Sequence, residues 1–238
     1  MVIPLGNLLQ EIQAITLDLD DTLWDIHPVI DDAERKLWDW LGAHYPNILD
    51  CFDREMVINL RKDVNQRYPN KSHDYRFIRR LVLKKLFSSS GYEEKFAEDA
   101  FHFFDTHRNK VKLYDGVLRT LDTLAERVKV IAVTNGNANL EMIGIDHLFH
   151  DAVYAADAGY PKPDIRIFDE AIRRSGVGTE SILHVGDHPE NDIVGAANAG
   201  LKTVWMNPKL QEWPDYLNKP DITISRISEL CDLLLPRD

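Results

Sequence analysis

The sequence has little of several features that mark specialised classes of protein. Its 238 residues include 2 cysteines, Cys51 and Cys231, too few for a disulfide framework. It has no apolar run of the roughly 20 residues that a bilayer-spanning helix needs. The first residues combine no basic segment with a long apolar stretch, so we expect no signal peptide. These absences predict reduced thiols, no membrane association and a cytoplasmic location.

Positive charge is also scarce. The chain carries 28 Lys and Arg against 39 Asp and Glu, which gives a formal net charge of −11. No basic cluster with interleaved aromatic residues offsets this balance, so the composition argues against nucleic acid as a partner. Hydrophobic residues make up 44% of the chain, as in ordinary globular proteins and unlike disordered ones. An anionic ligand would therefore need a local source of positive charge.

Short apolar segments that end at polar residues predict the strands of a sheet. Continuous apolar runs of this length are typical of parallel strands that are covered on both faces. We expect strands at residues 14–17, 128–133 and 182–185, with further candidates at 152–156 and 203–206. Helical patterns lie between them, at 117–124 and after Asp164, and this alternation indicates an α/β fold.

The segment between the first two strands follows a different pattern. It contains four helical patterns, near 29–41, 54–67, 74–87 and 93–108, and no convincing strand. We interpret it as a helical cap inserted after the first strand of an α/β core. The core is expected to be a Rossmann-like parallel sheet with helices on both faces. The predicted domains are the core, residues 1–23 with 112–238, and the cap, residues 24–111.

Polar residues follow the predicted strands, where open parallel sheets build their sites. The sequence Asp18-Leu19-Asp20-Asp21-Thr22 follows the first strand, and Thr134-Asn135-Gly136 follows the second. Gly186-Asp187 and then Asp192 follow a later strand, and Lys162 lies before them between two prolines. A D-x-D-x-T match arises by chance at roughly 1 in 8,000 positions, so a single motif is weak. The ordered set of motifs is specific.

This ordered set resembles the four motifs of the haloacid dehalogenase-like hydrolase superfamily, whose members commonly carry a helical cap between the first and second motifs. The resemblance covers the whole chain. It implies that Asp18 is the nucleophile and Asp20 the general acid and base. It also implies that Thr134 and Lys162 belong to the catalytic set, and that Thr134, Asn135 and Lys162 bind the substrate phosphate. The implied cofactor is Mg²⁺, held by Asp18, Asp20 (through its carbonyl), Asp187 and Asp192.

The chemistry of these residue types agrees with that assignment. A carboxylate can attack phosphorus and form an aspartyl-phosphate, which divides one difficult step into two easier ones. Since two anions must then approach each other, a bridging cation is needed, and Mg²⁺ prefers carboxylate and phosphate oxygens. The Asp20 side chain is then available to protonate the leaving alcohol and to deprotonate water. Lys162 and Mg²⁺ together nearly balance the four carboxylates.

Alternative interpretations remain open at the level of sequence. Asp192 is also a good helix cap, or a residue that orients metal ligands without binding the ion. Dehalogenase-type members of the superfamily lack an aspartate at the position of Asp20, so phosphoryl transfer is favoured over carbon–halogen cleavage. Thr22 is more typical of phosphatases than of sugar phosphomutases. A phosphomutase and a catalytically inactive, phosphate-binding regulatory protein are the alternative functions.

The substrate is expected to be a small phosphate monoester. The stretches 17–30 and 134–140 are similar to a bacterial subfamily that dephosphorylates flavin mononucleotide and 5-amino-6-(5-phospho-D-ribitylamino)uracil. A planar ring could stack on Trp24, Trp38 or Tyr75, although each is as readily a core residue. The basic run from Arg76 to Lys85 is expected to be a solvated helix face or a positive surface, and His184 a buried core residue.

Overall fold

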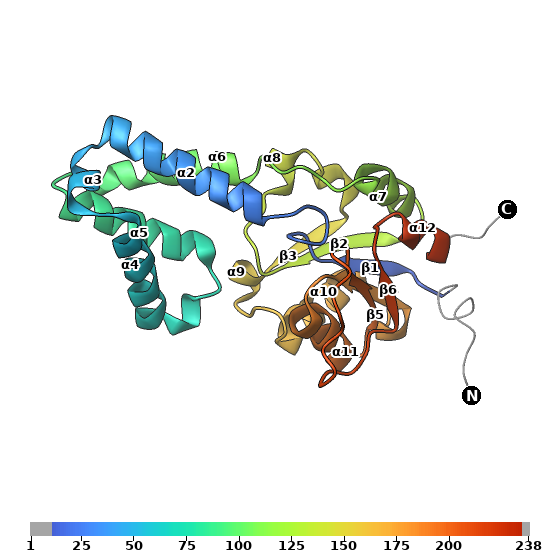
Figure 1. Ribbon diagram of the computed structural model, residues 1–238. Helices are drawn as coiled ribbons and strands as arrows, with labels where there is room; N and C mark the ends of the chain where they lie inside the picture. Colours follow the sequence, from blue (N-terminus) through green and yellow to red (C-terminus); the bar gives the residue numbers. More distant parts are fainter. Residues whose placement is uncertain (1–10, 235–238) are drawn as a thin grey trace. The chain divides into compact units, whose positions relative to one another are not determined.

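A six-stranded parallel sheet organises the part of the chain that the computed structural model describes, residues 11–234 (Figure 1). Its strands are β1 (Ala14–Leu17), β2 (Lys129–Thr134), β3 (Asp151–Tyr154), β4 (Ile182–Gly186), β5 (Lys202–Met206) and β6 (Ile222–Ile224). They lie in the order β3-β2-β1-β4-β5-β6, so the chain builds outward from β1 first on one side and then on the other. The predicted α/β fold with a Rossmann-like parallel sheet is confirmed.

The register of the sheet brings the ends of three strands together. Leu17 at the end of β1 pairs with Ala132 on β2 and with Val185 on β4. Since all three strands run in the same direction, the residues that follow them leave the sheet at one edge. β1 and β4 are buried along their whole length, which explains why their sequences are apolar without alternation.

Helices cover both faces of this sheet. Figure 1 shows α7 (Val117–Ala125) and α12 (Glu229–Leu234) on one face, and α10 (Ile165–Ser175) and α11 (Gly195–Asn198) on the other. The α10 helix begins at Asp164, whose side chain accepts a hydrogen bond from the Arg166 amide, and ends at Gly176 in the left-handed conformation. Shorter elements complete the connections: α9 (Ala155–Ala158), η3 (Asp146–Leu148), η4 (Thr179–Ser181) and a turn of π-helix, η5 (Pro189–Val194).

Two strand predictions need correction. β6 was not predicted, because a three-residue edge strand with one exposed side chain is too short to show a period. The strand expected at 152–156 is displaced, since β3 covers Asp151–Tyr154 and the chain then turns into α9. None of the helices within residues 11–234 combines the length and the apolarity needed to cross a membrane.

The helices after the first strand build their own core. They are α2 (His27–His44), α3 (Asn47–Cys51), α4 (Arg54–Arg67), η1 (Pro69–Lys71), α5 (Tyr75–Ser89), η2 (Glu94–Phe96) and α6 (Ala97–Arg108). α2 packs against α6, and α5 packs against both α4 and α6. The core between them is formed by side chains at helical spacing, such as Ala33, Leu37 and Leu41 on α2.

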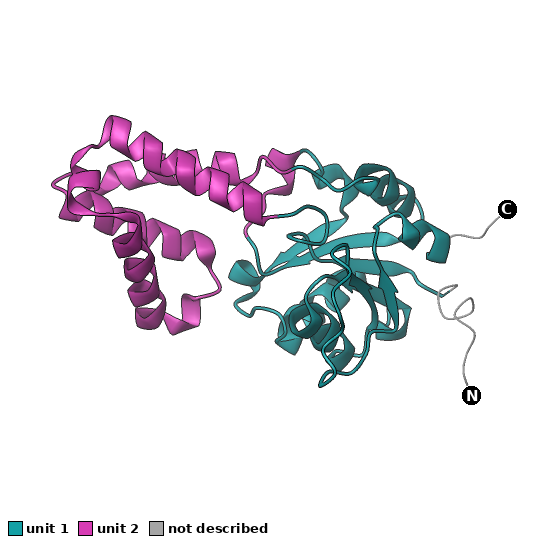
Figure 2. Cartoon of the chain, in the orientation of Figure 1, with its two compact units in different colours: residues 1–25, 112–136, 144–238 teal, residues 26–111, 137–143 magenta. Residues whose placement is uncertain are grey.

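Backbone contacts divide the chain into two compact units (Figure 2). The first contains the described residues up to Asp25, 112–136 and the described residues from Gly144 onward; the second contains 26–111 and 137–143. The sequence had placed 137–143, which includes α8 (Leu140–Ile143), in the core domain. In the structure this segment groups with the helical unit, where Asn137 accepts hydrogen bonds from Arg76 Nη2 (3.2 Å) and Arg108 Nε (3.0 Å), and the domain boundaries stay a prediction.

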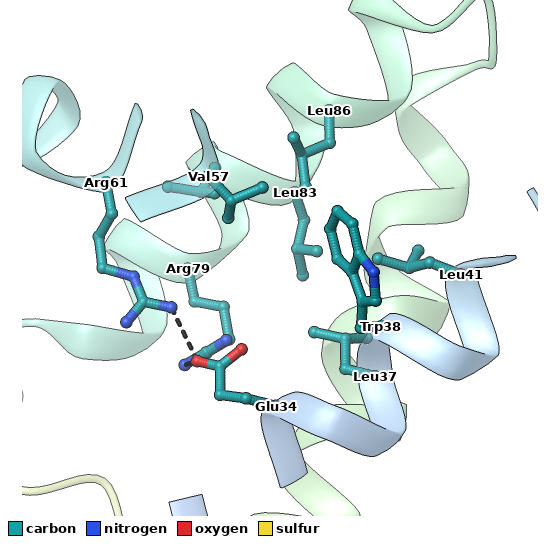
Figure 3. A pocket seen from close by; sticks show the side chains of 10 residues that line it. Glu34, Leu37, Trp38, Leu41, Val57, Arg61, Arg79, Leu83 and Leu86 are labelled. Carbon is teal, nitrogen blue, oxygen red and sulfur yellow. Dashed lines mark hydrogen bonds and ion pairs between the residues drawn. The ribbon is translucent and has the colours of Figure 1, made fainter. Parts of the chain in front are cut away.

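A cavity of about 30 Å³ lies inside the helical unit (Figure 3). Its apolar wall is formed by Leu37, Trp38, Leu41, Val57, Leu83 and Leu86, and at one end Glu34 accepts hydrogen bonds from Arg61 and Arg79, both at 2.8 Å. The Arg79 guanidinium lies 3.3 Å from the centre of the Phe104 ring. Arg79 therefore packs inside the unit, and the expectation that the basic run is a solvated or positive face is wrong there.

Candidate active site

The loop after β1 presents Asp18 and Asp20 from a tight turn. The Asp18 amide donates to the Val185 carbonyl of β4 at 2.9 Å, so Asp18 still belongs to the sheet. Asp21 then adopts a left-handed conformation with φ of 63°, and its amide donates to the Trp24 carbonyl at 2.8 Å. Asp tolerates this conformation better than most residues. The turn therefore reverses the chain directly after Asp20.

Lys162 lies between two buried carboxylates. Its Nζ donates to Asp18 Oδ1 at 2.5 Å and to Asp192 Oδ1 at 2.6 Å. All three side chains are almost completely buried. Burial lowers the pKa of Lys162, but the two carboxylates outweigh burial and hold that pKa above its ordinary value. Lys162 is therefore charged, and it supplies the local positive charge that the composition required.

Asn135 fixes the backbone of Lys162. Its Nδ2 donates to the Lys162 carbonyl at 2.9 Å, and its Oδ1 accepts from the Lys162 amide at 2.7 Å. Both ends of the side-chain amide are thus used, and a phosphate contact by Asn135 stays a prediction. Thr134 is buried at the end of β2, where its Oγ1 accepts a hydrogen bond from the Gly136 amide at 2.9 Å.

Asp192 is held on both of its carboxylate oxygens. Besides Lys162, Oδ1 contacts His184 Nε2 at 3.4 Å, and Oδ2 accepts from the His188 amide at 2.9 Å. Burial pushes the pKa of Asp192 upward, but Lys162 and His184 hold it below its ordinary value. A Cβ at Gly186 would lie 2.3 Å from the Asp192 carboxyl carbon, so only glycine fits there. His184 is fully buried, as predicted.

Three carboxylates meet at this edge of the sheet. Oxygen atoms of Asp18, Asp187 and Asp192 all lie within 4.8 Å of one another, and Thr22 Oγ1 lies 3.2 Å from both Asp18 Oδ2 and Asp187 Oδ1. Burial, together with Asp192 and Asp20 and against the effect of Lys162, raises the pKa of Asp18 to about 7. Burial and the charges of Asp18 and Asp192 raise the pKa of Asp187 to about 8.

These residues fit a divalent cation. With Lys162 as the cation inside the cluster, three carboxylates leave an excess of negative charge in a buried place. Carboxylate oxygens are the ligands that Mg²⁺ prefers, and it is usually bound by one or two of them together with substrate phosphate. Asp18 and Asp187 are the better placed ligands, because Asp192 Oδ1 contacts both Lys162 and His184 and its Oδ2 accepts from a backbone amide. Asp18 Oδ2 and Asp187 Oδ1, in contrast, share the hydroxyl of Thr22 at 3.2 Å.

Two tryptophans contact aspartates of the site: Trp205, which the sequence did not indicate, and Trp24, for which it suggested a different role. Trp24 Nε1 donates to Asp20 Oδ1 at 2.9 Å, and Trp205 Nε1 donates to the Asp187 carbonyl at 2.7 Å. The idea that Trp24 stacks on a substrate ring is wrong, because its side chain has no exposed surface. The role of Trp205 could have been predicted from its position in an apolar strand, because a buried indole N–H usually donates to a nearby acceptor.

An open parallel sheet with a helical insertion and acidic residues at its strand ends is an arrangement typical of α/β enzymes. Residues 12–200 match the family described as haloacid dehalogenase-like hydrolase, and the chain belongs to this family. The predictions that it is an enzyme and that it is a hydrolase are therefore confirmed.

Named relatives extend over nearly the whole chain. The 5-amino-6-(5-phospho-D-ribitylamino)uracil phosphatase YigB of Escherichia coli is 31% identical over 239 residues, which cover 97% of this chain and 98% of YigB. A glyceraldehyde 3-phosphate phosphatase of Methanopyrus kandleri is 31% identical, with coverage of 94% and 97%. The crystal structure of a 2-haloacid dehalogenase from Pseudomonas syringae pv. Tomato has a TM-score of 0.88 and 36% identity, with coverage of 94% and 98%.

Proposed function

We propose that the protein is a Mg²⁺-dependent phosphatase that hydrolyses small phosphate monoesters through an aspartyl-phosphate on Asp18. The observation that carries this proposal is the placement of the buried Asp18 carboxylate against Lys162 and near Asp187, with a second aspartate, Asp20, in the same loop. The relatives named as phosphatases support it, since they align over most of the chain.

The first chemical step transfers the phosphoryl group to Asp18. An Asp18 carboxylate oxygen attacks phosphorus, the bond between phosphorus and the ester oxygen breaks, and its electron pair goes to that oxygen. The leaving oxygen takes a proton from the carboxyl group of Asp20. Lys162 stays charged between Asp18 and Asp192, where it offsets the negative charge of the phosphate and of the carboxylates.

The second step restores Asp18. A water oxygen attacks phosphorus, the bond between phosphorus and the Asp18 oxygen breaks, and a proton of the water passes to Asp20. The same group thus acts first as an acid and then as a base. Bound Mg²⁺ would supply a positive charge that lets the phosphate approach Asp18, with Asp18, Asp187 and the Asp20 carbonyl as its ligands. We propose that the role of Asp192 is to orient Lys162. Its direct contact with the metal stays a prediction.

Dehalogenation is the second candidate, because the 36% identity to a structure described as a 2-haloacid dehalogenase favours it. A halide ion leaves without a proton, so that reaction makes no use of an acid beside the nucleophile. Asp20 is held near Asp18 by a hydrogen bond from Trp24, and this carboxyl group suits an ester oxygen, which does need a proton. The chemistry therefore favours hydrolysis of phosphate esters over dehalogenation. It likewise favours an enzyme over a regulatory protein without activity.

For the substrate we propose flavin mononucleotide or 5-amino-6-(5-phospho-D-ribitylamino)uracil. The name of YigB supports this choice, and the relatives named as glyceraldehyde 3-phosphate phosphatases make a small sugar phosphate the competing choice. Tyr75 is 53% exposed at the start of α5, and its stacking on a planar ring stays a prediction. A cytoplasmic location stays a prediction.

Phosphate release tests the proposal. We expect the protein with Mg²⁺ to release phosphate from p-nitrophenyl phosphate, and chelation of the metal to stop this. Asp18→Asn removes the nucleophile and should lower kcat by at least about 10³-fold. The matched control is Asp122→Asn on the exposed face of α7, which should retain full activity.

A panel of natural phosphates then ranks the substrates by kcat/KM. Net release of phosphate from flavin mononucleotide or the ribitylamino-uracil phosphate supports the proposal, whereas transfer between sugar hydroxyls without net release would indicate a mutase. Chloride release from 2-chloropropionate without phosphate release would establish the dehalogenase instead. A protein inactive with every substrate and with Mg²⁺ would sink both enzymatic functions.

A further inference from the structure

The indole of Trp24 is fixed in the structure before it meets Asp20. Trp24 has no exposed surface, and its backbone forms an antiparallel bridge with Leu113. The flanking residues are held as well, since the Tyr114 amide donates to the Leu23 carbonyl at 2.8 Å. The ring therefore occupies one position, and its Nε1 donates to Asp20 Oδ1 at 2.9 Å. An N–H group held in this way can set the orientation of the carboxylate that accepts its hydrogen bond.

Gly136 lies next to the other oxygen of the Asp20 carboxylate, Oδ2. A Cβ at Gly136 would lie 2.3 Å from Asp20 Oδ2, much closer than side chains approach each other. The backbone of Gly136 is not left-handed, so the requirement for glycine comes from space alone. Such a Cβ would also lie 3.2 Å from Thr134 Oγ1. Asp20 Oδ2 is thus directed toward the segment that follows β2.

We propose that Trp24 is a positioning residue for Asp20, and that its N–H holds Oδ1 so that Oδ2 exchanges the proton of the reaction. This inference rests on the proposed function, in which Asp20 donates a proton to the ester oxygen and accepts one from water. The carboxylate torsion of an aspartate is broad when nothing constrains it. Proton transfer needs heavy atoms within about 2.6–3.2 Å, so free rotation of the Asp20 carboxylate would slow the proton transfer. The hydrogen bond from Trp24 restricts this rotation.

The leaving group separates this role from a merely structural one. An alkyl alcohol needs a proton as it leaves, whereas p-nitrophenolate is stable enough to leave without one. The parameter kcat/KM reports the steps up to cleavage of the ester bond, and kcat includes hydrolysis of the aspartyl-phosphate. Misplacement of Asp20 should therefore affect kcat/KM of an alkyl phosphate strongly and that of p-nitrophenyl phosphate weakly.

The test compares Trp24→Phe with the wild-type protein on glycerol 2-phosphate and p-nitrophenyl phosphate. Misplacement of the acid should remove part of the roughly 10²–10⁴-fold that general acid catalysis contributes, so kcat/KM for the alkyl phosphate should fall by about 10- to 100-fold. For p-nitrophenyl phosphate kcat/KM should fall by less than about 3-fold, since its step needs little acid catalysis. Hydrolysis of the aspartyl-phosphate should slow, so p-nitrophenol should appear in a burst equal to the enzyme concentration.

Further variants keep the test independent of folding. Replacement of Trp24 by β-(3-benzothienyl)alanine keeps the ring shape and removes only the N–H, so it should give the same pattern as Trp24→Phe. In an Asp20→Asn background, Trp24→Phe should have little additional effect. Trp40→Phe replaces an indole that packs against the core of the helical unit, and it should leave the ratio of the two substrates unchanged.

The outcomes are distinct. An equal loss of kcat/KM on both phosphates without a burst, or full activity of the benzothienyl variant, would overturn the role of Trp24 and leave the proposed function intact. A wild-type protein that releases no phosphate from any ester would overturn the proposed function and this inference together. A loss of kcat/KM that Trp24→Phe causes selectively on the alkyl phosphate, and that is absent in the Asp20→Asn background, would establish the positioning role of Trp24.

Discussion

At the scale of single residues, the site depends on side chains that hold other side chains. Asn135 is the clearest case, because its side-chain amide forms two hydrogen bonds with the backbone of Lys162 and so fixes the position from which the Lys162 side chain extends. Since each such bond contributes roughly 0.5–1.5 kcal/mol, Asn135→Ala should lower the free energy of unfolding by about 1–3 kcal/mol. The looser Lys162 should raise KM for phosphate esters by roughly 10-fold and affect kcat less, because its charge acts on bound phosphate throughout. Urea denaturation and phosphate-release kinetics measure the two effects.

The matched control is Asn218→Ala, which truncates an exposed asparagine and should change neither quantity. If Asn135→Ala lowered stability but left KM unchanged, Asn135 would be a structural residue without influence on phosphate binding.

The sequence predicted which acidic residues follow the strands, and the structure brings Asp18, Asp187 and Asp192 together. That much was predictable because parallel strands end at one edge of a sheet. The partners were not predictable. Asn135 and Lys162 are 27 positions apart, and Trp205 reaches the carbonyl of Asp187 from another strand. Hydrogen bonds between distant residues follow from packing, which leaves no periodic signal in a single sequence.

At the scale of elements, the strands in the centre of the sheet were predictable and its edge was not. β1 and β4 are buried on both faces, so their largely apolar sequences predict strands. β6 has three residues, too few to show a hydrophobic period. Helix positions were predictable from their period, but the partners of charged residues were not. Arg79 has a charged side chain on α5, yet it lies over the Phe104 ring and pairs with Glu34.

The ion pairs of Glu34 join three helices and give the helical unit a dependence on pH. Burial pushes the pKa of Glu34 upward, but Arg79 and Arg61 outweigh it and lower the pKa to about 2 from an ordinary 4.5. Because the pKa is lowered in the folded state, the stabilisation is complete above 4.5 and is lost as pH falls toward 2. The Glu34 side chain keeps 31% exposure, so after solvent screening we expect a contribution of roughly 1 kcal/mol.

Urea denaturation of the wild-type protein and of Glu34→Gln measures this contribution. The difference between their free energies of unfolding should be roughly 1 kcal/mol near neutral pH and should vanish as pH falls toward about 2. Comparison with the Gln variant cancels the other carboxyl groups that titrate in the same range. A difference that stays constant with pH would show that Glu34 stabilises the helices through packing instead of charge.

At the scale of the whole molecule, each of the two compact units has a hydrophobic core of its own among the described residues. Ala14, Ile131 and Ile182 belong to one core, in the α/β unit, and Leu37, Leu83 and Phe104 to the other, in the helical unit. The segment 137–143 follows the second strand in sequence but belongs with the helices. Hydrogen bonds explain this, since Asn137 Oδ1 accepts from Arg108 Nε and the Asn139 backbone amide donates to Asn109 Oδ1. No change of composition marks this segment in the sequence, so its grouping with the helices follows from contacts between residues that are distant in sequence.

The proposed metal site lies wholly in the α/β unit, so Mg²⁺ should stabilise that unit selectively. A ligand that binds only the folded state at 100 times its dissociation constant stabilises by about 2.7 kcal/mol, which slows exchange through global opening by roughly 100-fold. Hydrogen exchange with Mg²⁺ should therefore slow at β1 and β4, while α4 and α5 exchange at unchanged rates. Sodium chloride at matched ionic strength controls for screening, and Asp187→Asn should abolish the protection. Equal slowing in both units would show that they open together, and no slowing at all would refute the metal site.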